Sequence, residues 1–338
     1  MFPATHFSNP WLTKQAREIG GCNTDLLERC VHALTLLGHL AETGLPFVFK
    51  GGTSLLLHLD PVRRLSIDVD IVCGAPATEV TRIVAEIAKK APFVRVEEDD
   101  RGERGLPQRR HFKFYFRSAL GTRAELPILL DVVEESQQVH TVIQRPIRAH
   151  FLEPEREVLV TVPTVESLLG DKLTAFAPAT TGVPFYNAKG DDQRLQVAKQ
   201  LFDVGVLFDA AADFGQMAGT YDAMHAVESG YRPSRPSREA ALTDTLQACL
   251  ALTAPKRRDV AAYPDAPLLR NGFDRLGGHL TWAGFGREHR RTLAARAAVL
   301  AAHLRARRVF DFATARYTGS AEQIAALRAA TLNGTPHA

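Results

Sequence analysis

The chain has little that suits a membrane, a secretion route or a disulfide-stabilised fold. No apolar run approaches the ~20 residues that a transmembrane helix needs. The first twenty residues lack the basic patch and apolar core of a secretory signal. Four cysteines are scattered along the sequence without a CxxC pair. We therefore expect buried free thiols, no membrane association and a cytoplasmic location.

The composition is that of an ordinary globular protein. The 338 residues are 45% hydrophobic and 23% charged, and they suffice for two modest domains. The net charge is only +3, but residues 256–316 hold thirteen Lys or Arg against five Asp or Glu. This excess indicates either a polyanionic partner or a solvated helical surface, and the sequence leaves both readings open.

Hydrophobic periodicity divides the chain into a mixed part and a helical part. In the first part we predict helices at 23–42, 54–58 and 78–91, strands at 46–50, 65–73, 93–97, 111–117 and 123–133, a charged hairpin loop at 99–110, and extended segments at 139–150 and 157–162. Beyond residue 163 we predict helices at 164–177, 193–212, 214–229, 238–251 and 287–307. The predicted fold class is α+β: a mixed β-sheet domain with flanking helices over residues 1–162, then a helical domain over 163–338.

A glycine pair follows the first predicted strand. Gly51 and Gly52 allow a sharp turn and a close approach of the backbone to a ligand. Thr53 and Ser54 then begin a helix, where free N–H groups and the helix dipole favour phosphate. Lys50, just before the turn, either neutralises phosphate or extends its ammonium out of the sheet. We predict a phosphate-binding turn at Gly51–Ser54.

Three aspartates are candidate metal ligands. Asp68 and Asp70 lie two apart on a predicted strand, so both carboxylates share one face of the sheet. Carboxylates held this close repel each other unless a cation lies between them, and paired oxygen ligands suit Mg²⁺ or Mn²⁺. Asp131 interrupts an apolar strand, where an unpaired charge is costly. If the two strands are neighbours, all three carboxylates converge.

These motifs together resemble a known family. KGGTSL followed by RLSIDVDI resembles the first motif of the AbiEii/AbiGii toxins, including the MenT toxins, in the DNA polymerase β-like nucleotidyltransferase superfamily. ESLLGDKLTAF around Lys172 and KQLFDV around Asp203 resemble the family's later motifs. The resemblance covers roughly residues 45 to 205.

The resemblance assigns roles to further residues. It implies that Gly52, Thr53 and Ser54 meet the triphosphate, that Lys172 contacts the nucleotide, and that Asp203 is the acidic residue of the following helix. The sequence leaves Asp192 as an alternative to Asp203. It also leaves open that Asp203 is a helix-surface acid paired with Lys199.

The resemblance also implies the reaction. We expect a nucleotidyltransferase that moves a nucleoside monophosphate from an NTP to an acceptor hydroxyl, with Mg²⁺ or Mn²⁺, as the toxin of a type IV-like toxin–antitoxin pair. The implied acceptor is RNA, such as the 3′ end of tRNA, and the implied protein partner is an antitoxin. The alternatives are transfer to a small molecule or a protein, and an NTP-binding module without catalysis.

Overall fold

The central element is a five-stranded sheet. The structure is a computed structural model that describes all residues except 100–107, 122, 135–138, 254–262, 317–321 and 324–338. The strands lie in the order β1-β2-β5-β4-β3; β2 and β5 run parallel, and the other neighbours are antiparallel. Their bounds are β1 Val48–Lys50, β2 Val69–Cys73, β3 Phe93–Glu98, β4 Gln108–Arg117 and β5 Glu125–Glu134. The α+β class predicted from the sequence is confirmed, whereas most of the predicted 99–110 loop lies outside the described residues.

The prediction for β2 was too long. The strand was expected to begin at residue 65, but it begins at Val69, so Asp68 lies in the extended segment just before it. β2 starts late because the neighbouring strand β1 is short and pairs only with residues 70–72 of β2. Upstream, Arg64 and Leu65 bond instead to residues near 280, through a bridge between Arg64 and Leu280 and a bond from Leu65 N to His279 O.

One face of the sheet is apolar and covered by helices. The side chains of Phe112, Phe114 and Phe116 are buried on this face, which confirms that this aromatic strand is part of the core. The helices α2 (Thr24–Ala41) and α4 (Ala77–Ile87) belong to the same cluster of buried residues. Asn23 caps α2 by accepting a hydrogen bond from Leu26 N, so the helix starts close to the predicted residue 23.

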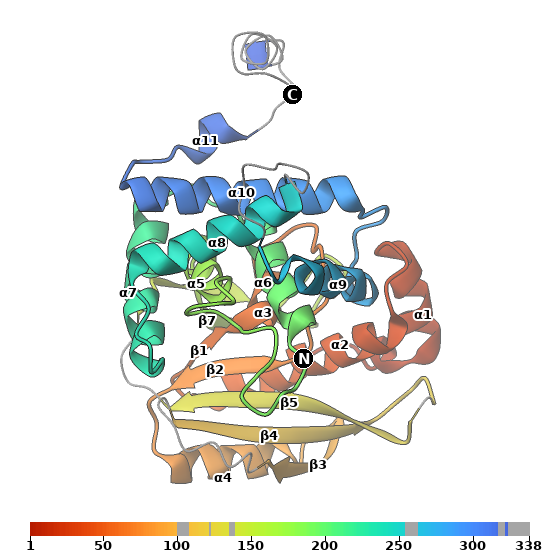
Figure 1. The fold of residues 1–338 in the computed structure, drawn as a ribbon. Helices are drawn as coiled ribbons and strands as arrows, with labels where there is room; N and C mark the ends of the chain where they lie inside the picture. Colours follow the sequence, from red (N-terminus) through yellow and green to blue (C-terminus); the bar gives the residue numbers. More distant parts are fainter. Residues whose placement is uncertain (100–107, 122, 135–138, 254–262, 317–321, 324–338) are drawn as a thin grey trace.

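Helices gather on the other side of the sheet (Figure 1). In that view α10 and the short α11 lie farthest from the strands, and α5, α6 and α7 lie between α10 and the sheet. The predictions missed α1 and α9, whose few apolar residues stand among many polar ones. The remaining bounds are η1 Ala4–Phe7, α1 Asn9–Glu18, α3 Gly51–Ser54, η2 Leu55–Leu57, β6 Val142–Pro146, β7 Leu159–Pro163, α5 Val165–Ala175, α6 Arg194–Leu207, α7 Phe214–Tyr231, α8 Arg238–Thr253, α9 Ala266–Leu276, η3 Gly277–His279, α10 Arg287–Ala306 and α11 Phe312–Ala315.

The buried residues form two separate apolar clusters. The first draws its members from residues 2–162 and the second from 168–312, with Leu55 as the exception that joins the second cluster. We propose on this basis that the chain consists of a domain over 1–162 and a helical domain over 163–338. The strands β6 and β7 form a sheet of their own, and the last residue of β7, Pro163, falls just past the proposed boundary.

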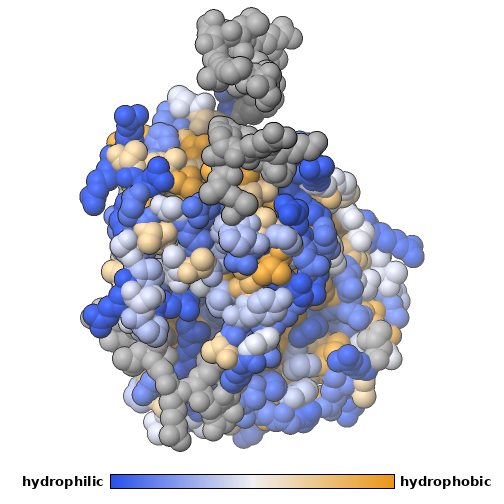
Figure 2. Space-filling model, in the orientation of Figure 1, coloured by the Kyte–Doolittle hydropathy of each residue, from blue (hydrophilic) through white to orange (hydrophobic). Residues whose placement is uncertain are grey.

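Some features of the surface and interior were expected from composition. The four cysteines are free and buried, as predicted. No helix within the described part of the chain is both long and apolar enough to span a bilayer. On the face shown in Figure 2, hydrophilic residues dominate, and apolar ones form small scattered patches. Such a surface offers no broad apolar area on that face.

A buried histidine in the first core should make stability depend on pH. His32 is 3% exposed and stacks on Phe116, with ring centroids 3.5 Å apart. Burial lowers its pKa to about 4. The unfolded chain therefore binds a proton between pH 6.5 and 4 that the folded protein does not, so this contribution to stability is lost as the pH falls through that range.

The free energy of unfolding should fall as the pH is lowered from 7 to 4.5. We expect this fall to be smaller in His32→Phe than in the wild type, by about 2–3 kcal/mol. Urea unfolding at both pH values measures this difference. Parallel pH dependence in the two proteins would show that folding does not lower the pKa of His32.

Candidate active site

Four polar side chains form one row across the sheet. The register pairs Lys50 of β1 with Asp70 of β2, Asp70 with Asp131 of β5, and Asp131 with His111 of β4. Paired residues on neighbouring strands point to the same face, and here this is the face opposite the buried phenylalanines. The predicted convergence of Asp70 and Asp131 is therefore found, because β2 and β5 are adjacent.

The two glycines each make room for a charged side chain. Gly51 has a φ of +81°, and a Cβ there would lie 2.0 Å from Asp70 Oδ2. A Cβ on Gly52 would lie 2.6 Å from Arg64 Nη2. The turn therefore directly contacts the Asp70 carboxylate and the Arg64 guanidinium. A larger residue at either position would displace one of them.

The aspartates repel one another. Burial, followed by the charges of Asp68 and Asp131, raises the pKa of Asp70 to about 7. Burial and Asp131 also raise the pKa of Asp68, while Lys199 opposes the shift. Asp68 belongs to the same electrostatic cluster, although it precedes the strand. Each carboxylate would gain from a cation in their midst.

Thr53 and Ser54 are fully buried, and neither lines the cavity beside the aspartates. Ser54 Oγ donates to Gly51 O over 2.9 Å, which closes the turn. Among the described residues, Thr53 Oγ1 has no hydrogen-bond partner. The predicted helix at 54–58 begins earlier, as the short α3 at Gly51, and continues as η2. Of the predicted phosphate-binding turn, only Gly51 lines the cavity.

A cavity of about 220 Å³ lies between the sheet and the helical domain. From the sheet it is lined by Lys50, Gly51, Asp70 and Asp131. From the helical domain, α5 contributes Asp171 and Lys172, and α6 contributes Gln200. Both halves of the chain thus supply charged groups to one space.

Lys172 is held by two residues of α6. Its Nζ lies 3.1 Å from Gln200 Oε1 and 3.3 Å from Asp203 Oδ2. Asp203 is fully buried and also accepts two bonds from Arg64, of 2.6 and 2.7 Å. Asp203 is therefore not a surface acid paired with Lys199. It fixes Lys172 and Arg64, and it does not line the cavity.

Asp192 lies elsewhere. It stands in an exposed loop, where it pairs with Arg194 and Arg275. Its closest partners are thus surface cations. Of the two acids left open by the sequence, Asp203 is the one connected to the cavity.

Sequence reasoning gave no role to three residues that belong to this site. Arg64 forms the buried ion pair with Asp203. His111 Nδ1 lies 2.7 Å from Asp131 Oδ1. Lys199 has its pKa lowered to about 8 by burial and by Arg64. A signal was available for His111, because strand alternation places it on the face opposite the three phenylalanines.

The carboxylates do not form a complete metal cage. Within the described ranges, no group of three or more His, Cys, Asp or Glu side chains is arranged to hold a metal ion alone. Mg²⁺ commonly uses one or two carboxylates together with substrate phosphates and water. The paired Asp70 and Asp131 match that smaller requirement.

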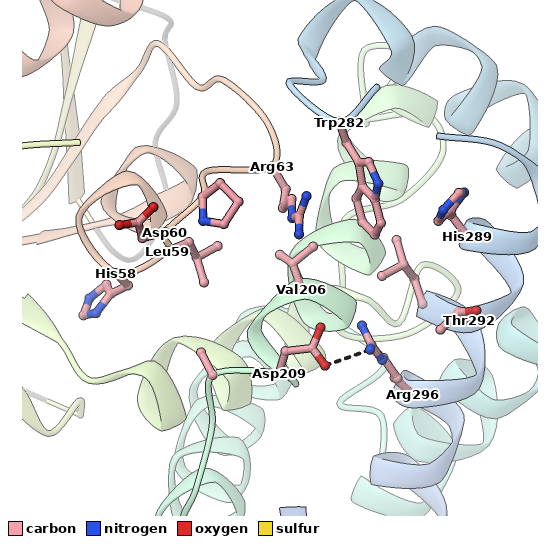
Figure 3. A pocket seen from close by; sticks show the side chains of 13 residues that line it. His58, Leu59, Asp60, Arg63, Val206, Asp209, Trp282, His289, Thr292 and Arg296 are labelled. Atoms are coloured by element: carbon pink, nitrogen blue, oxygen red, sulfur yellow. Dashed lines mark hydrogen bonds and ion pairs between the residues drawn. The ribbon is translucent and has the colours of Figure 1, made fainter. Parts of the chain in front are cut away.

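A second, larger cavity lies at the far end of α6 (Figure 3). It encloses about 450 Å³ and shares no lining residue with the aspartate cavity. Arg63 lies over the ring of Trp282, 4.7 Å from its centroid, and Arg296 pairs with Asp209 over 2.7 Å. None of the predicted site residues lines this cavity. Its size alone therefore does not make it the reaction site.

Comparison with known proteins places this geometry in a family. The profile of the AbiEii nucleotidyl transferase toxins of type IV toxin–antitoxin systems matches residues 35–300, most of the chain. The chain belongs to the AbiEii family. This AbiEii protein is accordingly a nucleotidyltransferase enzyme, as the first motif predicted. No curated protein sequence matches it.

Two solved structures are similar to this AbiEii protein. One is MenT4, a nucleotidyltransferase toxin from Mycobacterium tuberculosis H37Rv, with a TM-score of 0.50 and 16% identity; the match covers 87% of this chain and 99% of MenT4. The other is JHP933 from Helicobacter pylori, with a TM-score of 0.43 and 13% identity over 90% of this chain and 98% of that one. At these identities, the likeness to MenT4 supports the shared fold.

Proposed function

We propose that this AbiEii protein transfers a nucleoside monophosphate from an NTP to a hydroxyl of RNA, such as the 3′ end of tRNA, and releases pyrophosphate. We further propose that the reaction needs Mg²⁺ or Mn²⁺. One observation carries the proposal: the paired Asp70 and Asp131 lie beside the Gly51 turn in the wall of a cavity that Lys172 lines from the helical domain.

The chemistry of the donor set fits a divalent cation. Asp70 is a carboxyl whose neighbours Asp68 and Asp131 disfavour its ionised form, so a cation bound among them would relieve the repulsion. When bound, divalent cations supply positive charge to the attacking oxygen and to the departing pyrophosphate. We assign Asp68, Asp70 and Asp131 as the residues that would hold them.

The triphosphate would lie between the turn and α5. The backbone at Gly51, Gly52, Thr53 and Ser54 can approach it closely, since neither glycine carries a side chain. Because Thr53 and Ser54 are buried, their share would come from backbone N–H groups. Lys172, held in place by Asp203, would neutralise charge on the phosphates.

Asp131 is the residue we assign to the attacking hydroxyl. Its carboxylate is in the cavity lining and accepts a bond from His111, so its orientation is fixed. In this position it would draw the proton from the acceptor hydroxyl as that oxygen attacks the α-phosphorus. The bond from the α-phosphorus to the bridging oxygen breaks, and pyrophosphate leaves.

Exposed arginines of the helical domain support an RNA acceptor. Four of them lie on α9, on α10 or just after α10: Arg270, Arg287, Arg307 and Arg308. Within the described residues, no carboxylate forms an ion pair with any of these four. Other arginines of this region, such as Arg290 and Arg296, are paired with acids. Unpaired surface arginines bind phosphate backbones regardless of sequence. We extend the proposal to an antitoxin as protein partner and to the cytoplasm, in keeping with the family.

Incubation of the protein with each α-labelled NTP, Mg²⁺ and total RNA tests the function. We expect label in RNA and stoichiometric release of pyrophosphate, both abolished by EDTA. Parallel reactions with protein and with small hydroxyl compounds as acceptors identify the acceptor class. Label in one of those, with none in RNA, would overturn the RNA assignment. NTP binding without pyrophosphate release, with every acceptor, would overturn the enzymatic one.

The His111 contact leads to a graded prediction. His111→Ala should lower kcat by about 10- to 100-fold, as is typical when a residue that orients a metal-binding carboxylate is lost. The KM for the NTP should change less, because His111 does not line the cavity. His111→Asn should recover part of kcat, since its amide nitrogen can take the place of Nδ1. Equal kcat values in the wild type and His111→Ala would contradict the role.

A further inference from the structure

The side chain of Gln200 lies in the wall of the aspartate cavity. It comes from α6, and Asp203 follows it by three residues, so the two side chains share one face of that helix. This face meets Lys172 of α5, whose Nζ lies 3.1 Å from Gln200 Oε1 and 3.3 Å from Asp203 Oδ2. Asp203 is fully buried, whereas Gln200 is only partly buried. Gln200 therefore contacts both Lys172 and the interior of the cavity.

The contact with Lys172 determines which way the Gln200 amide is turned. An ammonium has three N–H donors and no acceptor, so only the amide oxygen of Gln200 can face it. The amide nitrogen must then point away from Lys172 Nζ. In the portion of the chain that the structure describes, no protein group accepts a hydrogen bond from this nitrogen, and the nitrogen is not enclosed. The Gln200 amide thus offers its N–H groups to a ligand in the cavity.

Lys172 retains one N–H group for the same ligand. Of the three donors of its ammonium, one faces Gln200 and one faces Asp203. No other acceptor in the described part of the chain bonds to this ammonium. Lys172 is 7% exposed, and it lines the cavity. An anion in the cavity can therefore accept from the Lys172 ammonium and from the Gln200 amide together.

We propose that Gln200 is a phosphate-binding residue of the transfer reaction. Its amide nitrogen donates to an oxygen of the triphosphate, and its amide oxygen holds the Lys172 ammonium beside the same phosphate. This inference rests on the proposed function, since it assumes that the triphosphate occupies the aspartate cavity. Hydrogen bonds to a charged acceptor such as phosphate are about twice as strong as those between neutral groups. The contact would therefore contribute measurably to the affinity for the NTP.

A carboxylate in place of the Gln200 amide separates the two parts of this role. Glutamate has the same size as glutamine, and one of its oxygens can still accept from Lys172. The other oxygen would replace the amide nitrogen, and it can only accept hydrogen bonds. The cavity wall already contains the carboxylates of Asp70, Asp131 and Asp171. A further negative charge there would repel the phosphates. Gln200→Glu therefore keeps the support of Lys172 and removes the donor to the phosphate.

The test measures the affinity of the full-length protein for tripolyphosphate and for NTPs, with Mg²⁺ and without RNA. We expect Gln200→Met, which is similar in size and has no amide, to weaken both affinities by about 10-fold. Gln200→Glu should weaken them by about 100-fold or more, since repulsion is added to the lost donor. The melting temperature of ligand-free Gln200→Glu should not fall, because Lys172 keeps its acceptor. Gln196→Glu makes the same change at an exposed position of α6, one turn earlier, and should match the wild type.

The outcomes separate this inference from the proposed function. If the wild type binds neither NTPs nor tripolyphosphate, the proposed function fails. If Gln200→Glu or Gln200→Met binds tripolyphosphate as tightly as the wild type, the phosphate contact of Gln200 fails while the transferase assignment stands. An unchanged affinity for tripolyphosphate with a raised KM for RNA in these variants would assign Gln200 to the acceptor and overturn the inference.

Discussion

Asp70→Asn is expected to lose nucleotidyl transfer by about 1,000-fold or more while the protein remains folded. Asp70 is at the centre of the row formed with Lys50 and Asp131, and it lies against Gly51. Asparagine keeps the shape but removes the charge that would hold a divalent cation, and charge stabilisation of the transition state is commonly the largest catalytic term. Single-turnover transfer from labelled NTP measures the loss.

The same substitution should stabilise the metal-free protein above neutral pH. The pKa of Asp70 is about 7, well above the ordinary 3.8, so the folded protein holds a proton that the unfolded chain has released. Stability of the wild type therefore falls as the pH rises from about 4 to about 7, by as much as about 4 kcal/mol. Asp70→Asn lacks this loss and should melt higher than the wild type at pH 8 without metal. Mg²⁺ should raise the melting temperature of the wild type only.

Asp60→Asn is the matched control. Asp60 is an exposed acid in the lining of the larger cavity, which shares no lining residue with the aspartate cavity. We expect transfer, melting and the Mg²⁺ response of this variant to equal those of the wild type. Full activity in Asp70→Asn, or loss of activity in Asp60→Asn, would falsify the choice of site.

Asp203→Asn is expected to reduce stability by about 3–5 kcal/mol and the melting temperature by roughly 10 °C. Asp203 is fully buried and bonds to Arg64 through both carboxylate oxygens. Removing the charge of Asp203 leaves Arg64, which is 6% exposed, as a buried cation without its ion-pair partner. Lys172 loses its ion pair as well, so transfer should also fall.

The comparison with Asp192→Asn separates a buried ion pair from an exposed one. Asp192 pairs with Arg194 and Arg275 in contact with solvent, and such pairs contribute about 1 kcal/mol or less. Its replacement should change melting by only a few degrees and leave transfer intact. If Asp192→Asn is the more damaging variant, Asp203 is not the acid that organises the site.

Local patterns in the sequence were sufficient to predict most of the fold. Alternation in residues 111–117 and 123–133 predicted β4 and β5, and the helical spacing of apolar residues over 23–42 predicted α2. These elements depend on residues that are close to one another in the sequence, so the sequence alone is enough to predict them. The start of β2 could not be predicted in this way. It depends on the length of β1 and on bonds between Leu65 and His279, two residues far apart in sequence.

The same distinction applies to the candidate site: residues in short motifs could be predicted, and residues that depend on tertiary contacts could not. The carboxylates and the glycine pair could be found because each belongs to a short motif with a physical purpose. Arg64 could not be assigned, because its role needs Asp203, 139 residues away. His111 required the register of β4 against β5. Such contacts are set by tertiary packing, which a single sequence does not reveal.

The contacts of the segment that leads into β2 have a consequence during synthesis of the chain. Arg64 bonds to Asp203, and Leu65 and Arg63 bond to backbone groups at residues 279 and 281. A nascent chain of 163 residues contains Asp68, Asp70 and Asp131 but neither Lys172 nor the residues that bond to Arg63, Arg64 and Leu65. The site is therefore complete only after about four-fifths of the chain has been synthesised, when residues 279 and 281 are available to bond to Leu65 and Arg63.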